Sequence, residues 1–303
     1  MRFSCSCFEP LCLALLCFVL LLCSAKAGAG VSLPQADGST LELNAPAKRL
    51  VTLSPHLAEL VFAAGAGRHL VATVDYSEYP EAAAAIPRVG DAFRIDVERV
   101  LSLKPDLVIA WDTGNPRQAT DQLKALGIPV WRVEIRELAE IADIIEAIGL
   151  ASAEQAPAGI EAGNFRRRLE ALSRRYDSRQ TLDFFYQVDA RPLFTINGEH
   201  LISKSLSLCG GRNIFHDQPG LAFNVAHESV IVADPEALIA PFLDNEADPL
   251  AAWHEWPGMQ AVRQDALFLL PADKISRATP RLLDALELAC SLLDGVREWS
   301  HNE

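Results

Sequence analysis

Aromatic and polar side chains recur directly after the predicted strands of this chain. In open parallel sheets, ligands bind in the crevice beyond the carboxyl ends of the strands. A mixture of rings, hydroxyls and charges suits a fairly large, partly apolar organic ligand better than a bare ion. The segments of this kind are Ser54-Pro55-His56, Asp75–Tyr79, Asp91–Arg94, Trp111–Asn115, Val188-Asp189, Leu221–Asn224 and Asp273–Arg277.

Sequence signals of catalysis or metal binding are weak. The chain contains no G-x-S-x-G elbow, no glycine-rich phosphate loop and no H-E-x-x-H pair. Its seven histidines are scattered, so we predict no metal site and no resident cofactor. His56 follows a predicted strand and is a candidate cleft residue. An exported enzyme that uses His56 or a carboxylate pair is the alternative, but we expect a protein that is not an enzyme.

The elements that must position these residues come in two similar sets. DVERVLSLKPDLVIAW (96–111) reads as a short helix, a turn and a buried strand, and ESVIVADPEALIA (228–240) repeats it more weakly. The alignment pairs Glu98 with Glu228 and Asp106 with Glu236. LAELVFAAGAGRHLV (57–71) and LISKSLSLCGGRNIF (201–215) form a second pair in the same order. Two ordered repeats predict two similar lobes.

Length and charge limit the function classes. The chain has 303 residues, half of them hydrophobic, which suits one large or two medium domains. The net charge is −13, with acidic residues spread along the chain. A nucleic-acid binder needs a basic face, so this charge argues against one, and also against binding to anionic membranes.

The N-terminus has the pattern of a signal peptide. Arg2 precedes an apolar core, CLALLCFVLLLC, which is too short for a comfortable membrane span. Ala25-Lys26-Ala27 is an A-x-A cleavage site, so we predict a signal peptide over 1–27 and export to the periplasm. Lipid attachment at Cys23 is the alternative, although Leu22 fits such a site poorly.

Cysteine usage is then informative. Five of the seven cysteines lie in the predicted signal peptide, so Cys209 and Cys290 remain. In an oxidising compartment two cysteines suggest one disulfide, within the second lobe. Two unpaired buried thiols are the alternative.

Strands alternate with helices in both halves, which predicts an α/β fold with parallel central sheets. We expect an N-terminal lobe at 46–150, a long linker helix at 151–178 and a C-terminal lobe at 179–300. The predicted strands are 40–43, 49–53, 70–74, 107–110, 129–133, 182–188, 193–196, 237–242 and 266–270. The predicted helices are 55–64, 97–101, 118–126, 138–148, the linker, one ending at Cys209, one at Glu228, 253–262 and 281–298.

The chain from about Arg49 to Trp299 resembles the periplasmic binding proteins that feed ABC importers for vitamin B12, siderophores and haem. The matching stretches are LSPHLAELVFAAG, YSEYP, VERVLSLKPDLVIAW, LCGGRNIF and SRATPRLLDAL. The resemblance is strongest to the cobalamin binders, which implies cobalamin as transported ligand. It also implies two Rossmann-like lobes on a helical linker, a monomer, and permease subunits as partners.

The resemblance assigns roles to particular residues. Glu98 and Glu228 match the glutamates that meet arginines of the importer, and Cys209 and Cys290 match the family's disulfide. For the cleft, Tyr76 and Trp111 match an aromatic wall, and Asp273 and Arg277 match polar residues of the second lobe. These four residues, together with Ser54 at a strand end, are predicted ligand contacts.

The sequence departs from the cobalamin pattern at several cleft positions. Ala92 and Ala222 replace two tryptophans, and Val188 replaces a phenylalanine. Phe93 and Phe223, next to the alanines, are the candidates to compensate and are included among the predicted ligand contacts.

The alternative within the class is a haem or ferric-siderophore binder. Tyr76, Tyr79 or His56 would then supply an iron ligand. A siderophore pocket usually needs several positive side chains, and the segments above offer mainly Arg94 and Arg277.

Overall fold

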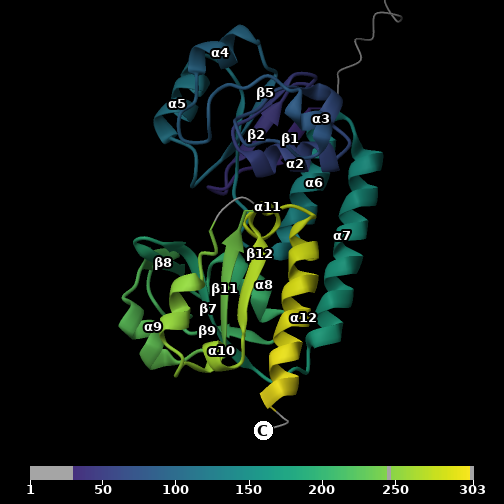
Figure 1. The fold of residues 1–303 in the computed structure, drawn as a ribbon. Helices are drawn as coiled ribbons and strands as arrows, with labels where there is room; N and C mark the ends of the chain where they lie inside the picture. The colour runs from purple at the N-terminus through teal and green to yellow at the C-terminus, as the bar shows by residue number, and fades with distance from the viewer. Residues whose placement is uncertain (1–29, 244–246, 301–303) are drawn as a thin grey trace, which may run out of the picture.

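The computed structural model describes residues 30–243 and 247–300. The predicted signal peptide 1–27 and the alternative lipid site at Cys23 lie outside the described residues. The described chain forms two α/β lobes that lie one above the other, with a long helix along one side of both (Figure 1).

The N-terminal lobe is built on a four-stranded parallel sheet in the order β4-β3-β5-β6. In β5, Leu107 and Ile109 pack on one side of the sheet, and Val108 and Ala110 pack on the other. The unbroken apolar run therefore does mark a strand covered on both faces. The strands are β1 (Val31–Pro34), β2 (Thr40–Leu43), β3 (Leu50–Thr52), β4 (Leu70–Ala72), β5 (Leu107–Trp111) and β6 (Val130–Val133), with β1 and β2 forming a separate antiparallel hairpin.

Helices cover both faces of this sheet. The short helix α4 begins where the Asp96 carboxylate accepts a hydrogen bond from the Arg99 backbone N–H (2.9 Å). The helices near 55–64, 118–126 and 138–148 lie close to the predicted ranges, whereas the short elements at 67–69 and 81–84 were not predicted. The helices are α2 (Pro55–Ala63), the 3₁₀ turn η1 (Gly67–His69), α3 (Glu81–Ala84), α4 (Val97–Ser102), α5 (Arg117–Ala125) and α6 (Leu138–Ser152).

The linker is the single long helix α7 (Gln155–Tyr176), as the sequence predicts. It lies against α6, and their approach is so close that a Cβ on Gly149 would be 2.3 Å from the Ala158 Cβ. Ion pairs bind α7 to both lobes. Arg166 bonds to Asp143 and Glu146 of α6, and two residues later Arg168 bonds to Asp284 and Glu287 of α12.

The C-terminal lobe holds a six-stranded sheet in the order β10-β8-β7-β11-β12, with β9 also paired to β7. Strands β9, β7, β11 and β12 are parallel, whereas β8 and β10 are antiparallel, so this sheet is mixed. The elements are β7 (Leu182–Ala190), β8 (Leu193–Ile196), α8 (Leu201–Ser207), β9 (Gly211–Asn213), β10 (Ala222–Asn224), α9 (His227–Ala233), β11 (Ala237–Phe242), η2 (Ala251–Glu255), α10 (Gln260–Arg263), β12 (Leu267–Pro271), α11 (Ala272–Ile275) and α12 (Leu282–Ser300).

One predicted helix is wrong. We expect a helix over 253–262, but the chain forms a 3₁₀ turn to Glu255 and a separate short helix from Gln260. Pro257 and Gly258 lie between them and interrupt the helix. The short strands β1, β9 and β10 were not predicted from the sequence.

The internal repeat is confirmed by equivalent hydrogen bonds in the two lobes. The Asp106 carboxylate, before β5, accepts from the backbone N–H groups of Lys48 and Arg49 (2.8 and 3.0 Å). The Glu236 carboxylate, before β11, accepts from the backbone N–H of Asp183 (2.8 Å). The backbone N–H of each acidic residue donates back, to the Arg49 and Asp183 carbonyls (2.9 Å each). The aligned residues therefore join the same two strands in each lobe.

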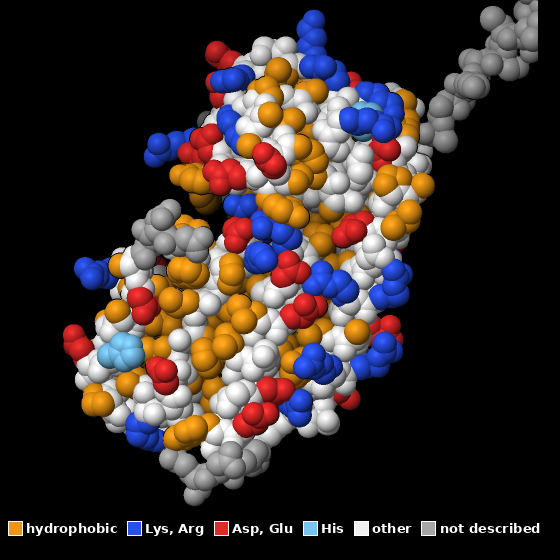
Figure 2. Space-filling view, turned by 45° about the vertical axis from the view of Figure 1, so that its right-hand side comes forward, with side chains coloured by type: hydrophobic (Ala, Val, Ile, Leu, Met, Phe, Trp, Pro, Cys, Tyr) orange, Lys and Arg blue, Asp and Glu red, His pale blue; other side chains and the backbone are white. Residues whose placement is uncertain are grey.

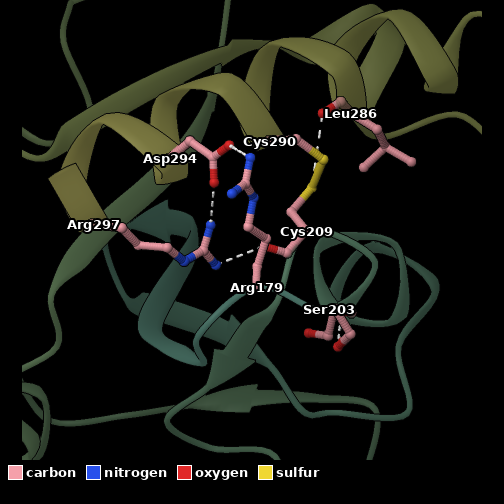
Figure 3. The surroundings of a disulfide bond; sticks show 8 residues. Arg179, Ser203, Cys209, Leu286, Cys290, Asp294 and Arg297 are labelled. Carbon is pink, nitrogen blue, oxygen red and sulfur yellow. Dashed lines mark hydrogen bonds and ion pairs between the residues drawn. A yellow bond between two sulfur atoms is a disulfide. The ribbon is translucent and has the colours of Figure 1, made fainter. Parts of the chain in front are cut away.

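The predicted disulfide joins Cys209, after α8, to Cys290 in α12, 81 residues apart (Figure 3). Both cysteines are buried. Next to it the Arg297 guanidinium donates to the Cys209 carbonyl (2.6 Å) and to Asp294 (2.8 Å). The bridge and the arginine therefore bind the last helix to the core of the C-terminal lobe.

Candidate ligand-binding cleft

The carboxyl ends of the parallel strands face the boundary between the lobes. In Figure 1 the arrows of β11 and β12 end beside α11, at the level where the two lobes meet. Figure 2 shows a notch between the lobes, with charged side chains gathered along the waist. We call this notch the cleft, bordered by the segments that follow β3, β4, β5, β7 and β12.

Two aromatic side chains of the N-terminal lobe extend into solvent. Tyr76 is 71% exposed and Phe93 is 70% exposed, which is unusual for large apolar rings. The Tyr76 backbone is left-handed, with φ of 64°. The loop under Phe93 is fixed by Asp91, whose carboxylate accepts from the backbone N–H of Phe93 (2.7 Å) and of Arg94 (2.8 Å). These rings are therefore presented by ordered backbone.

Trp111, at the end of β5, is half-buried and held on several sides. Its indole N–H donates to the Glu134 carboxylate (3.3 Å), and its ring meets the His56 ring edge-on, with centroids 5.4 Å apart. A Cβ on Gly114 would be 1.9 Å from the Trp111 ring, so this position must be glycine for the indole to lie where it does. The ring is thus a fixed part of the cleft wall.

Asn115 connects three cleft segments and was not among the predicted contacts. Its amide N–H₂ donates to the carbonyls of Leu53 (2.7 Å) and Ala92 (2.8 Å), and its carbonyl accepts from the Trp111 backbone N–H (2.7 Å). The side chain is buried. The sequence shows only that Asn115 lies four residues after the end of a predicted strand. That position alone does not distinguish a cleft residue from an ordinary turn residue.

Ser54 and His56 lie behind this wall. The Ser54 hydroxyl is buried and lies 2.5 Å from His56 Nδ1. Burial, with the nearby Arg277 guanidinium adding to it, lowers the pKa of His56 to about 4. The imidazole is therefore neutral at neutral pH.

The predicted polar contacts of the C-terminal lobe bond to protein groups. Asp273 accepts from Arg281 (2.6 Å). Arg277 donates to the buried carboxylate of Glu59 (2.6 Å) and to the Tyr76 carbonyl (3.0 Å), so it reaches across to the other lobe. Glu59 and Arg281 were not predicted from the sequence.

The remaining predicted contact is Phe223, in the same lobe. Phe223, in β10, is half-buried and meets Phe215 edge-on (5.9 Å). Val188, near the end of β7, is exposed, as is Leu221. The alternative iron ligand Tyr79 lies with its ring under the Arg281 guanidinium (3.9 Å).

The two predicted docking glutamates occupy matching positions. Glu98 is exposed in the first turn of α4, and Glu228 is exposed in the first turn of α9. Two residues after each lies a buried valine, Val100 or Val230. Figure 1 places α4 and α9 on different lobes, both on the side away from α7.

A separate cavity of about 580 Å³ lies among α6, α7 and α8. Four of its charged side chains pair with one another, in the bonds of Lys204 with Glu137 and of Arg174 with Glu170. It is not formed by strand ends, where the ligands of open parallel sheets bind. Within the described residues no group of three or more His, Cys, Asp or Glu could hold a metal ion, and no helix is long and apolar enough to cross a membrane.

The chain therefore consists of two α/β lobes joined by one long helix, with the candidate site at the boundary between the lobes. The sequence model for periplasmic binding proteins matches residues 50–274, and the chain belongs to that family. Within it, the chain is similar to the vitamin B12-binding protein of Vibrio cholerae serotype O1, being 40% identical over 252 residues, 82% of this chain and 90% of that one. It is also similar to the vitamin B12-binding protein of Yersinia pestis, 36% identical over 250 residues, 82% of this chain and 88% of that one.

Solved structures agree with this assignment. The periplasmic vitamin B12 binding protein BtuF of Vibrio cholerae matches with a TM-score of 0.77 at 38% identity, over 83% of this chain and 98% of that chain. The periplasmic haem-binding protein HutB of Vibrio cholerae shares the fold, with a TM-score of 0.70 at 20% identity over 81% of this chain and 98% of that one.

Proposed function

We propose that this protein captures cobalamin in the periplasm and delivers it to an ABC importer for uptake across the inner membrane. The observation that carries the proposal is the 40% identity, over 82% of the chain, to a protein named for vitamin B12 binding. The protein acts by binding and not by catalysis, and cobalamin is its cargo rather than a cofactor. It is exported by a cleaved signal peptide over 1–27, with a lipid anchor at Cys23 as the alternative, and works as a monomer.

The cleft supports a large, partly apolar ligand. Exposed rings on ordered backbone, Tyr76 and Phe93, lose unfavourable contact with water when a broad apolar face covers them. Trp111 adds a fixed ring with a hydrogen-bonded indole N–H. Across the cleft, Phe223 and the exposed Val188 provide the facing apolar surface, and Arg277 and Asp273 provide polar groups at its edge.

Two losses relative to the cobalamin pattern shape this cleft. Ala92 and Ala222 stand where tryptophans are expected, so less aromatic surface is available next to Phe93 and Phe223. We propose that these two phenylalanines take over part of that contact, which leaves a cleft with more room beside the ligand.

Delivery uses Glu98 and Glu228. Each is an exposed carboxylate at the start of a helix, one on each lobe, away from the linker. Matching negative charges on two similar lobes suit basic pockets on two copies of a symmetric permease subunit. Their main effects are on orientation and association rate.

Isothermal titration of the purified protein with cyanocobalamin tests the proposal, with haem as the parallel titrant. We expect tight one-to-one binding of cobalamin. Haem binding without cobalamin binding would overturn the ligand and favour the haem alternative, for which the exposed Tyr76 hydroxyl is the candidate iron ligand. Binding of neither would leave only membership of the family.

A further inference from the structure

A buried carboxylate connects the two lobes at the back of the cleft. Glu59 lies on α2 in the N-terminal lobe, and its side chain is 2% exposed. It accepts hydrogen bonds from two arginines of the C-terminal lobe: from Arg277 Nη1 (2.6 Å), and from Arg281 Nε and Nη2 (3.0 Å each). An almost fully buried glutamate is rare unless it is paired, and this one is paired twice across the lobe boundary.

The two arginines share the carboxylate closely. Arg277 Nη1 and Arg281 Nη2 both bond to the same oxygen, Glu59 Oε1. Because they share one acceptor, the two guanidinium groups lie close together and repel each other. The Arg277 side chain is only 19% exposed and the Arg281 side chain 13%, so water screens the repulsion poorly. The negative charge of Glu59 therefore holds them together.

Each arginine also bonds to a further residue that follows a strand end. Arg277 Nη2 donates to the carbonyl of Tyr76 (3.0 Å), the residue with the left-handed backbone and the exposed ring. Arg281 donates to Asp273 and lies over the Tyr79 ring. A guanidinium has five N–H donors. Within the part of the chain that the structure describes, the hydrogen bonds of Arg277 use one hydrogen on each terminal nitrogen, which leaves donors for a ligand.

We propose that Glu59 is a positioning residue for ligand binding: it orients Arg277 toward the cleft and fixes the spacing of the two lobes. The proposal rests on cobalamin binding as the function of the cleft. Glu59 itself lies behind Arg277 and touches no ligand. Its contribution to affinity therefore passes through Arg277.

The test is a double-mutant cycle on cobalamin affinity, measured by isothermal titration. We expect Glu59→Gln to weaken binding at least tenfold, because the amide keeps one acceptor but loses the charge. In an Arg277→Ala background the same change should cost less than threefold. If Glu59→Gln binds as the wild type does, or loses the same factor in both backgrounds, the proposal is overturned, since a merely structural role gives equal losses.

A matched control tests whether the effect is specific to Glu59 or follows from the loss of any bond between the lobes. Glu137 also lies in the N-terminal lobe and also bonds across the boundary, to Lys204 of α8. Glu137→Gln should leave cobalamin affinity within twofold of the wild type. A tenfold loss in this control would overturn the specific role of Glu59.

A second variant keeps the test open if Glu59→Gln does not fold. Glu59→Asp serves instead, because it keeps the charge and shortens the reach by one methylene. Its expected result is a smaller loss that again disappears without Arg277, and equal losses in both backgrounds would overturn the proposal.

A ligand-free measurement distinguishes failure of this inference from failure of the proposed function. Small-angle X-ray scattering should show a larger radius of gyration for Glu59→Gln than for the wild type and Glu137→Gln. If the wild type binds no cobalamin, the proposed function fails, while the scattering still tests the spacing of the lobes. An unchanged radius would overturn that part of the inference.

Discussion

Breaking the Cys209–Cys290 bridge should cost the protein much of its stability. The bond closes a loop with a sequence separation of 81 residues. In the chain-entropy model, closing a loop of this length raises the free energy of the unfolded chain by about 4.5 kcal/mol at 25 °C. Measured effects usually fall below the model, so we expect a loss of about 2–4 kcal/mol in the free energy of unfolding.

Reduction is a cleaner perturbation than substitution. Both cysteines are fully buried, and replacing them with alanine would add the cost of a cavity to the loss of the bond. The protein is unfolded, reduced and refolded with reductant present. Urea titrations followed by circular dichroism then compare it with the oxidised protein. We expect a steeper slope against urea for the reduced protein, because its unfolded chain is no longer closed into a loop and exposes more surface. The comparison therefore uses the unfolding free energies extrapolated to zero urea.

One result would refute this reasoning. If reduced and oxidised proteins unfold with free energies within about 0.5 kcal/mol of each other, the loop-closure argument fails for this chain. Cobalamin titration of the reduced protein serves as the control for folding. The bridge joins the turn after α8 to the middle of α12, and neither cysteine lies in a cleft segment, so affinity should stay unchanged.

Three further predictions concern docking, pH and helix packing. The double reversal Glu98→Lys and Glu228→Lys should abolish transport in whole cells while cobalamin affinity stays within twofold; normal uptake, or lost affinity, would contradict the docking role. The folded-state pKa of His56, about 4, lies below its ordinary value of about 6.5. The contribution of His56 to the free energy of unfolding is therefore complete above pH 6.5 and is lost as the pH falls toward 4. His56→Gln should flatten the dependence of the unfolding free energy on pH between 4 and 6.5. Parallel wild-type and variant curves would contradict this role of His56. Gly149→Val should lower the unfolding free energy by about 1–3 kcal/mol, because the valine side chain must enter the space of the Ala158 methyl group. An unchanged urea midpoint would contradict this, since it would mean that α6 and α7 separate at no cost in free energy.

The fold follows well from the sequence because its strongest signals are local or repeated. The buried run of β5, the first turn of α4 and the long linker each show their pattern within a few residues. The repeat adds a long-range prediction: Asp106 and Glu236 align in the sequence, and in the folded protein they make equivalent hydrogen bonds. The failure over 253–262 is also local, because that prediction ran one helix through Pro257 and Gly258.

The cleft was predicted less completely, because its bonds join distant parts of the chain. Glu59 meets Arg277 and Arg281 at separations of 218 and 222 residues, and no spacing rule links such positions. One sign was available. Glu59 is a charged residue within the apolar run of α2, which is unusual for a buried helix face unless the charge has a partner. The identity of that partner required the fold.

The double attachment of α7 has a consequence for how a ligand leaves. Arg166 bonds to one lobe and Arg168, two residues later, bonds to the other, so a movement of either lobe relative to α7 would strain one of these sets of ion pairs. We therefore expect the lobes to open little by themselves, and the residence time of the ligand to be set by its own contacts with the cleft walls. A partner that must empty the cleft cannot wait for spontaneous opening. On the proposed docking, we expect the partner to supply that work by holding the lobes apart from outside, at the two helices that carry Glu98 and Glu228.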